Sequence, residues 1–273
     1  MEFSKPIFDI IKERTSRRTY GKTPLAGDLK EKMLGLLAEP AESPFGAECE
    51  FRWITLEGLE ASQKKKLGTY GFITGARDFI AGTVKKVEAL AGEHLGYVLE
   101  NIILHATDLG LGTCWLAGSF NKSGFAEQAK LGADERMPAI TPIGVFKNRR
   151  PVEGVIRLVV KANHRKPWNV LFFDNDFTTS LSSENTGELS DAFEGVRLGP
   201  SASNGQPWRI IRSDNGEAIH LYAAGGMDLD RGIAVCHFDL IVKERGIAGS
   251  WAIKDPGIAT PEGMKYVISW HRN

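Results

Sequence analysis

Apolar residues recur every three or four positions in several stretches of the chain, and this spacing predicts amphipathic helices. In the first stretch Ile7, Ile10 and Ile11 share one helical face, and Ser4 is the expected N-cap. The longest stretch has a wide apolar face, which predicts a central, buried helix. Helices are expected over residues 5–13, 28–38, 59–67, 90–109, 188–198 and 230–245.

Other stretches are short and rich in β-branched and aromatic residues, which predicts strands. These strands are expected over residues 48–56, 76–84, 139–146, 207–212, 218–223 and 265–271. Residues 163–190 are polar with a short aromatic cluster, and we expect a crossing connection there. Because helices and strands do not alternate strictly, their order predicts an α+β fold with helices flanking a mixed or antiparallel sheet.

The chain contains a degenerate internal repeat. Residues 95–115 align without a gap with residues 231–251, so that Gly96 meets Gly232 and Trp115 meets Trp251. Chance recurrence of a helix, a glycine and a tryptophan is the alternative, but a helix and a strand upstream recur in the same order. We therefore expect a first half at 1–162, a connecting segment at 163–187 and a shorter second half at 188–273. Such a chain would imitate a homodimer, with a site built from both halves.

Composition and charge exclude some classes of partner and cofactor. The chain has 273 residues, of which 34 are basic and 34 are acidic, so its formal net charge is zero. This balance argues against nucleic acid or an anionic membrane surface as the main partner. Charges interrupt the apolar positions of the N-terminus, which predicts a cytoplasmic protein. Cys49, Cys114 and Cys236 are too far apart for a typical zinc motif, so no structural metal is expected.

Three short motifs could carry chemistry. The run "ERTSRRTY" (13–20) combines guanidinium and hydroxyl groups, which suit phosphate oxygens, although such a run is also typical of a solvated surface. The run "KNRRP" (147–151) follows a strand and is open to the same two interpretations. The turn "GTCWLAG" (112–118) leaves backbone N–H groups approachable by a flat ligand, or is a plain connection.

A fourth motif, "GPSASNGQPWRI" (199–210), is a polar loop that runs into a strand. Together with "IKERTSRRTYGKTPL", "ENIILHATDLGLGTCWLAGSF" and "PIGVFKNRRPVE", it resembles the motifs of the nitroreductase family of FMN flavoproteins. The single-chain arrangement resembles Thermotoga-type nitroreductase-like proteins. In the family the arginine run and the Pro-Ser-x-x-Asn loop belong to one unit. Here they lie in different halves, and Thr15 stands where the family has its second arginine.

The resemblance implies an FMN site shared between the halves, since family members are typically homodimers with FMN at the interface. It implies that Arg14, Thr15, Ser16 and Arg18 hold the phosphate, the ribityl chain or the pyrimidine edge. Lys147 and Arg149 would neutralise the phosphate. The isoalloxazine ring would lie against Leu116, Ala117 and Gly118, and the second half would close the pocket with Pro200, Ser201, Ser203 and Asn204.

Only one such site is expected in each chain. Residues 167–196 contain no lysine or arginine but several carboxylates, which would repel a phosphate at the position of a second site. The corresponding loop of the first half, "SPFGAECE", has also lost the Ser-x-x-Asn pattern. One FMN per chain is therefore expected, and a monomer is sufficient to build the site.

The resemblance implies hydride transfer from NAD(P)H through FMN to a small-molecule acceptor such as a nitroaromatic or a quinone. No side chain is singled out as a catalytic acid or base, because the cofactor carries the redox chemistry. Two alternatives remain open at the level of sequence. One is a flavin-binding or sensing protein without turnover, and the other is a structural remnant that binds no flavin.

Overall fold

The computed structural model describes residues 1–40 and 42–273. Its α-helices are α1 (Ile7–Glu13), α2 (Gly27–Ala38), α3 (Ala61–Lys66), α4 (Ala91–Asp108), α5 (Lys122–Gln128), α6 (Pro151–Val159), α7 (Trp168–Leu171), α8 (Ser190–Leu198) and α9 (Asp228–Glu244). Its strands are β1 (Glu50–Thr55), β2 (Asp78–Lys85), β3 (Gly112–Thr113), β4 (Glu135–Gly144), β5 (Phe172–Asp174), β6 (Trp208–Ser213), β7 (Ala218–Ala224), β8 (Gly249–Ala252) and β9 (Met264–Arg272). Short 3₁₀ turns are η1 (Ser183–Asn185), η2 (Gly187–Leu189), η3 (Ala202–Asn204) and η4 (Asp214–Gly216).

The strands form two separate sheets, which confirms the α+β class. The first sheet has the order β1-β2-β4-β3 and is antiparallel throughout. The second has the order β5-β6-β7-β9-β8, in which β5 pairs with β6 in parallel and the other pairs are antiparallel. The parallel edge strand β5 lies in the segment that was expected to be only a connection. It was missed because three residues are too few to show the alternation that identifies a strand.

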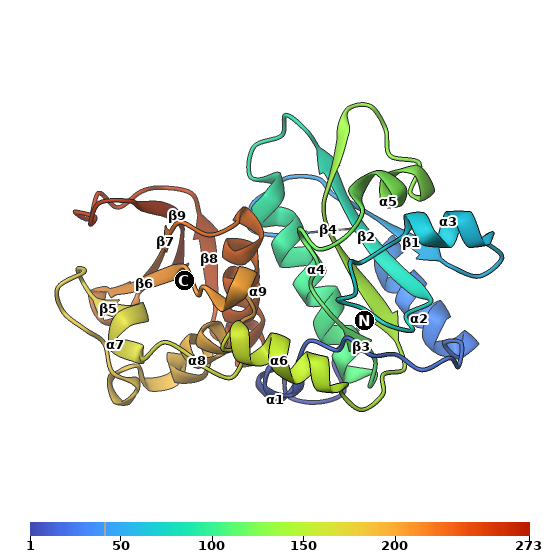
Figure 1. The fold of residues 1–273 in the computed structure, drawn as a ribbon. Coiled ribbons are helices and arrows are strands. Elements are labelled where there is room, and N and C mark those ends of the chain that lie inside the picture. Colours follow the sequence, from blue (N-terminus) through green and yellow to red (C-terminus); the bar gives the residue numbers. More distant parts are fainter. Residues whose placement is uncertain (41) are drawn as a thin grey trace.

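Helices α4 and α9 pack against each other between the two sheets (Figure 1). They approach so closely that a Cβ atom added to Gly96 would lie 2.3 Å from the carbonyl oxygen of Leu229. A Cβ atom added to Gly232 would lie 2.0 Å from the carbonyl oxygen of Glu93. The two aligned glycines therefore have reciprocal roles, each admitting the backbone of the opposite helix, as in the self-complementary interface of a two-fold dimer.

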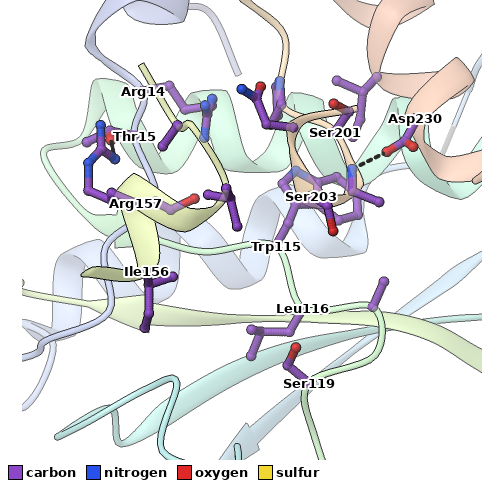
Figure 2. A pocket seen from close by; sticks show the side chains of 18 of the residues that line it. Arg14, Thr15, Trp115, Leu116, Ser119, Ile156, Arg157, Ser201, Ser203 and Asp230 are labelled. Carbon is purple, nitrogen blue, oxygen red and sulfur yellow. Dashed lines mark hydrogen bonds between the residues drawn. The ribbon is translucent and has the colours of Figure 1, made fainter. Parts of the chain in front are cut away.

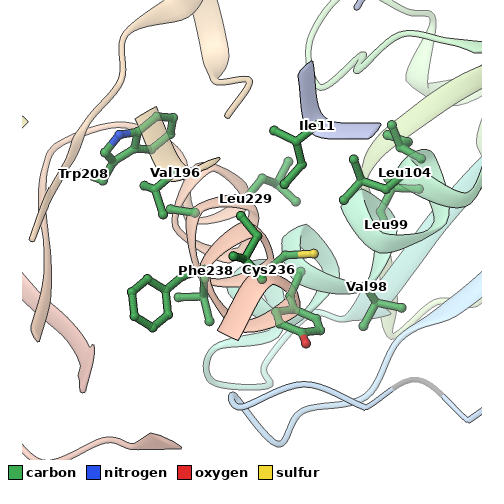
Figure 3. Close-up of a cluster of buried hydrophobic side chains, with 14 of the residues drawn as sticks. Ile11, Val98, Leu99, Leu104, Val196, Trp208, Leu229, Cys236 and Phe238 are labelled. Atoms are coloured by element: carbon green, nitrogen blue, oxygen red, sulfur yellow. The ribbon is translucent and has the colours of Figure 1, made fainter. Parts of the chain in front are cut away.

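One hydrophobic core crosses the boundary between the two sheets. Figure 3 shows Leu99 of α4 and Cys236 of α9 on the facing sides of the two helices, with Ile11 of α1 beside them, while Phe238 and Val196 lie on the far side of α9. Each of these side chains is at most 2% exposed. Burial of a large apolar side chain contributes about 1.5–3 kcal/mol. The shared core consequently holds the walls of any site between the sheets in a fixed relation.

The expected helices are all present within about three residues at their ends. Ser4 does not cap α1, because Pro6 occupies the N-cap position and the Ser4 hydroxyl donates to Asp108 at 2.7 Å. The expected strand at 139–146 begins earlier, at Glu135, and ends at Gly144. Helices α5 and α6 and strand β8 were not anticipated. No helix in the described part of the chain is long and apolar enough to cross a membrane.

Candidate functional site

A cavity of about 710 Å³ lies where the N-terminal segment, the turn after β3, helix α6 and the loop before β6 meet. Its volume is in the range of pockets that hold small molecules and cofactors. Figure 2 shows Arg14 and Thr15 on one side and Ser201, Ser203 and Asp230 on the other, with Trp115 between them. Segments distant in the sequence thus form the walls, because the shared core holds both sheets together.

Most of the residues singled out in the sequence line this cavity together. The N-terminal run, the small-residue turn and the loop of the second half all reach it. The lining includes Arg14, Thr15, Ser16, Arg18, Leu116, Ala117, Gly118, Pro200, Ser201, Ser203 and Asn204.

Lys147 and Arg149 are not brought to the cavity. The chain after β4 pairs with the N-terminal segment, where the Lys147 backbone N–H donates to the carbonyl oxygen of Thr19 at 2.9 Å. Arg149 instead lines an adjoining hollow of about 510 Å³. Its guanidinium donates to Thr15 Oγ1 at 3.2 Å, so it supports the cavity wall from behind. Neither side chain is part of the cavity lining, so the contact of Lys147 and Arg149 with a phosphate stays a prediction.

The cavity is also lined by two arginines, Arg157 and Arg165, that were not predicted from the sequence. Arg157 projects from α6 and donates to Thr15 Oγ1 at 3.2 Å. Arg165 donates to Asn204 Oδ1 and to the carbonyl oxygen of Leu198, each at 3.2 Å. The amphipathic stretch "PVEGVIRLV", which begins with proline at the first helical turn, was the available signal for α6. Nothing local in the sequence indicated that its arginine faces the N-terminal run.

The cavity wall carries positive charge that the protein itself does not neutralise. In the part of the chain that the structure describes, no carboxylate lies within ion-pair distance of Arg18, Arg157 or Arg165. Burial, followed by the neighbouring charge of Arg149, lowers the pKa of Arg157. Burial, with the nearby charge of Arg14, lowers the pKa of Arg165 to about 10. Cations that crowd together in this way favour an anionic ligand.

Several buried donors at the cavity also lack a partner. Within residues 1–40 and 42–273, the Nε atoms of Arg14, Arg18 and Arg165 make no hydrogen bond. Arg14 Nε lies 3.6 Å from Glu100 Oε1, which is an ion-pair contact but too long for a hydrogen bond. A buried donor without an acceptor is unfavourable, so these groups suit a ligand that is rich in acceptor oxygens.

The turn after β3 lines the cavity and contains backbone N–H groups without a partner in the described chain. Leu116 exchanges two backbone hydrogen bonds with Ile140 of β4, at 3.0 and 2.9 Å, which fixes the turn against the first sheet. Among the described residues, the N–H groups of Ala117 and Gly118 find no acceptor. A planar ligand lying on this turn would therefore meet free backbone donors.

The loop at 200–206 is held by its own side chains. Ser201 Oγ accepts the backbone N–H of Gln206 at 2.9 Å, and the Asn204 amide donates to the carbonyl oxygen of Lys161 at 2.8 Å. Ser203 and Asn204 have positive φ angles of 50° and 57°, which few residue types adopt readily. Asn204 thus ties the loop to the segment after α6, while the Ser203 hydroxyl remains available to a ligand.

Asp230 is the acidic residue of the cavity lining, and it is only 3% exposed. Its carboxylate accepts the backbone N–H of Ala202 at 2.9 Å and that of Met227 at 3.1 Å. Burial raises the pKa of Asp230 above its ordinary value, against the effect of these two hydrogen bonds. Its carboxylate therefore fixes the loop to the start of α9 and does not neutralise the arginines.

Two sheets around a closely packed helix pair, with an arginine-lined cavity between them, define a nitroreductase-like α+β fold. The family model described as "Putative TM nitroreductase" matches residues 6–242, and the chain belongs to this family.

Several solved structures are similar to this chain. The chain is similar to a Thermotoga maritima protein described as a "putative nitroreductase", with a TM-score of 0.64 and 19% identity, over 100% of this chain and 96% of that one. A Bacteroides thetaiotaomicron protein described as a "Putative NADH dehydrogenase/NAD(P)H nitroreductase" aligns with 54% of this chain and 90% of its own (TM-score 0.45, 20% identity). A Desulfovibrio desulfuricans protein described as a "putative nitroreductase in complex with fmn" aligns with 56% of this chain and 95% of its own (TM-score 0.40, 20% identity). No curated protein matches the chain.

Proposed function

We propose that the cavity binds one FMN and that the protein is an oxidoreductase that transfers a hydride from NAD(P)H to a small acceptor, such as a nitroaromatic or a quinone. The observation that carries this proposal is the group of unneutralised arginines beside hydroxyl groups in a cavity of cofactor size. Membership of the nitroreductase family supports the same function.

The residues fit the phosphate of FMN at the arginine side of the cavity. Arg14, Arg18 and Arg165 each have a buried Nε donor without an acceptor in the described chain, and phosphate oxygens would supply acceptors. Arg157 adds charge from α6, and the hydroxyl of Ser16 lines the same region. Charge-assisted hydrogen bonds of this kind are about twice as strong as neutral ones. The phosphate would thus relieve both the repulsion among the arginines and the unmet donors.

The turn after β3 fits the ring system. Bound FMN would supply the hydride-transfer chemistry, and the protein would supply orientation and electrostatics. The free N–H groups of Ala117 and Gly118 would orient the ring and favour negative charge on it. Leu116 and Trp115 would cover it with apolar surface, and Ser203 would lie on the opposite wall. No side chain in the cavity needs to act as a general acid or base in this scheme.

We further propose that the chain is a pseudo-dimer with a site retained on one side only. The reciprocal contacts of Gly96 and Gly232 support an origin from two equivalent units. The cavity already takes one wall from each half of the chain, so a second copy is not needed to complete it.

The visible absorption spectrum of the purified protein, followed by NADPH and NADH oxidation with a quinone or nitroaromatic acceptor, tests the proposal. We expect a bound-flavin spectrum and acceptor-dependent oxidation. A colourless protein that binds no added FMN and oxidises neither nucleotide would overturn the proposal. Tight FMN binding without oxidation of either nucleotide would instead leave a flavin-binding protein without turnover.

A further inference from the structure

Behind the cavity wall lies a carboxylate that is completely buried. Glu100 of α4 is 0% exposed, and its Oε2 accepts the indole N–H of Trp115 at 2.6 Å. Its Oε1 lies 2.9 Å from His237 Nε2 of α9 and 3.6 Å from Arg14 Nε. Trp115 and Arg14 both line the cavity, so two residues of its wall contact the same carboxylate.

The same carboxylate is anchored in the second half of the chain. His237 Nδ1 lies 2.8 Å from the carbonyl oxygen of Gly195, and since a carbonyl only accepts, this nitrogen carries a proton. The short contact between His237 Nε2 and Glu100 then requires one further proton, shared within a pair whose net charge is zero. Glu100 thus links the wall formed by the first half to helices α8 and α9.

The repeat provides a second network of the same kind away from the cavity. Trp251, which aligns with Trp115, donates its indole N–H to Asp239 Oδ1 at 2.7 Å. Asp239 is 2% exposed and also accepts the hydroxyl of Tyr97, from the opposite helix, at 2.5 Å. Each tryptophan of the repeat is therefore held by a buried carboxylate that is bonded across α4 and α9. Trp251, Asp239 and Tyr97 do not belong to the cavity lining.

We propose that Glu100 is the positioning residue of the flavin cavity: its hydrogen bond holds Trp115 in the arrangement that binds FMN, and His237 couples that arrangement to the second half. This inference rests on the proposed function. The network around Glu100 controls ligand binding, whereas the network around Asp239 contributes only to folding.

Three variants separate these roles. Glu100→Leu removes the acceptor for Trp115, His237 and Arg14 while keeping a side chain of similar size. Glu100→Gln keeps the hydrogen bonds to Trp115 and His237, since its carbonyl can accept from Trp115 and its amide can donate to His237. It leaves the net charge of the Glu100–His237 pair at zero and removes only the 3.6 Å ion-pair contact with Arg14. Asp239→Leu makes the equivalent change in the network that lies away from the cavity.

FMN titration and thermal unfolding are measured for the wild type and all three variants. We expect Glu100→Leu to raise the Kd for FMN at least about tenfold, and Glu100→Gln and Asp239→Leu to leave it within about threefold. Both leucine variants should lower the Tm. An unchanged Kd in folded Glu100→Leu, or an equal rise in Asp239→Leu, overturns the inference, as does loss of binding in folded Glu100→Gln.

The indole N–H signals in an NMR spectrum give a readout without a ligand, with Trp115→Phe and Trp251→Phe used for assignment. Glu100→Leu should move the Trp115 signal and leave the Trp251 signal in place, and Asp239→Leu should do the reverse. A Trp115 signal unmoved by Glu100→Leu contradicts the positioning role. If the wild type binds no FMN, the proposed function fails, and these signals still decide whether Glu100 positions the wall.

Discussion

Thr15 receives two guanidinium groups, from Arg149 and Arg157, on a single hydroxyl oxygen. Two like charges brought to one neutral acceptor repel each other, and burial removes part of the water that would screen them. A dianionic phosphate beside this hydroxyl would turn that repulsion into attraction. Thr15, at the position where the resemblance implies an arginine, thus accepts hydrogen bonds from Arg157 of α6 and from Arg149, which precedes this helix.

Arg157→Ala should weaken FMN binding about tenfold or more, because a hydrogen bond to a charged group contributes about 1.5–3 kcal/mol. Riboflavin, which lacks the phosphate, should lose little affinity. Titration of both flavins into the variant measures the difference. Arg77→Ala is the matched control and should change neither affinity, because Arg77 is a half-buried arginine outside the cavity lining that pairs with Glu57 at 3.5 Å and donates to the carbonyl oxygen of Lys22 at 3.2 Å. Equal losses for FMN and riboflavin would contradict a contact between Arg157 and the phosphate.

The N-terminal arginines could be recognised in the sequence because they lie within a few residues of three hydroxyl groups. Arg157 and Arg165 could not, since their relation to Thr15 and Asn204 depends on how α6 folds back across the cavity. Glu100 could not be recognised from the sequence for a similar reason. On a helical pattern it is one polar residue among apolar ones, and its partner His237 lies more than a hundred residues further along the chain.

At the scale of elements, the crossing of α4 and α9 is set by glycines. A side chain at Gly232 would have to displace the backbone of Glu93, and backbone yields far less readily than the end of a flexible side chain. By contrast, Gly35 in the exposed part of α2 has no atom within 4 Å of an added Cβ. Glycine is therefore needed at position 232 for the helix crossing, whereas position 35 has room for a side chain.

Gly232→Ala should destabilise the protein by about 1–3 kcal/mol or more, since it overpacks the helix crossing. Gly35→Ala should stabilise it by about 0.5–1 kcal/mol, because alanine restricts the unfolded chain and favours a helix. Chemical denaturation of the two variants beside the wild type measures both changes. A Gly232→Ala protein as stable as the wild type would show that the two backbones can separate without loss.

The long helices were predictable because their apolar period extends over several turns, as in α4 and α9, whereas the shorter α5 and α6 were not anticipated. The short strands β3, β5 and β8 were not, because pairing with distant strands defines them more than their own composition does. The repeat aligned Gly96 with Gly232, but the crossing of the two helices at these glycines was not predicted. The register of that crossing required the structure.

At the scale of the molecule, the two halves differ most in charge. Carboxylates replace the basic run near the start of α8, and the structure pairs each with an arginine: Glu188 with Arg272, Asp191 with Arg245 and Glu194 with Arg197. In these ion pairs, arginines of the same chain neutralise the carboxylates. A phosphate at the position equivalent to the cavity would find no free cation in these pairs, because each arginine is already neutralised by a carboxylate.

We therefore predict one FMN per chain and a monomer in solution. Release of the flavin by denaturation, with absorbance and protein mass measured on the same sample, gives the ratio. Light scattering during size-exclusion chromatography gives the mass of the particle. A ratio of two flavins per chain would contradict the retention of a single site.

The cavity draws both of its walls from one polypeptide, and this has a consequence for how the site forms. When a site lies between separate subunits, its assembly is a bimolecular equilibrium and fails at sufficient dilution. Here the opposing walls are covalently joined and meet at a fixed effective concentration, so the intact site persists as the protein is diluted. Occupancy then depends only on the ligand concentration, even where the protein is scarce.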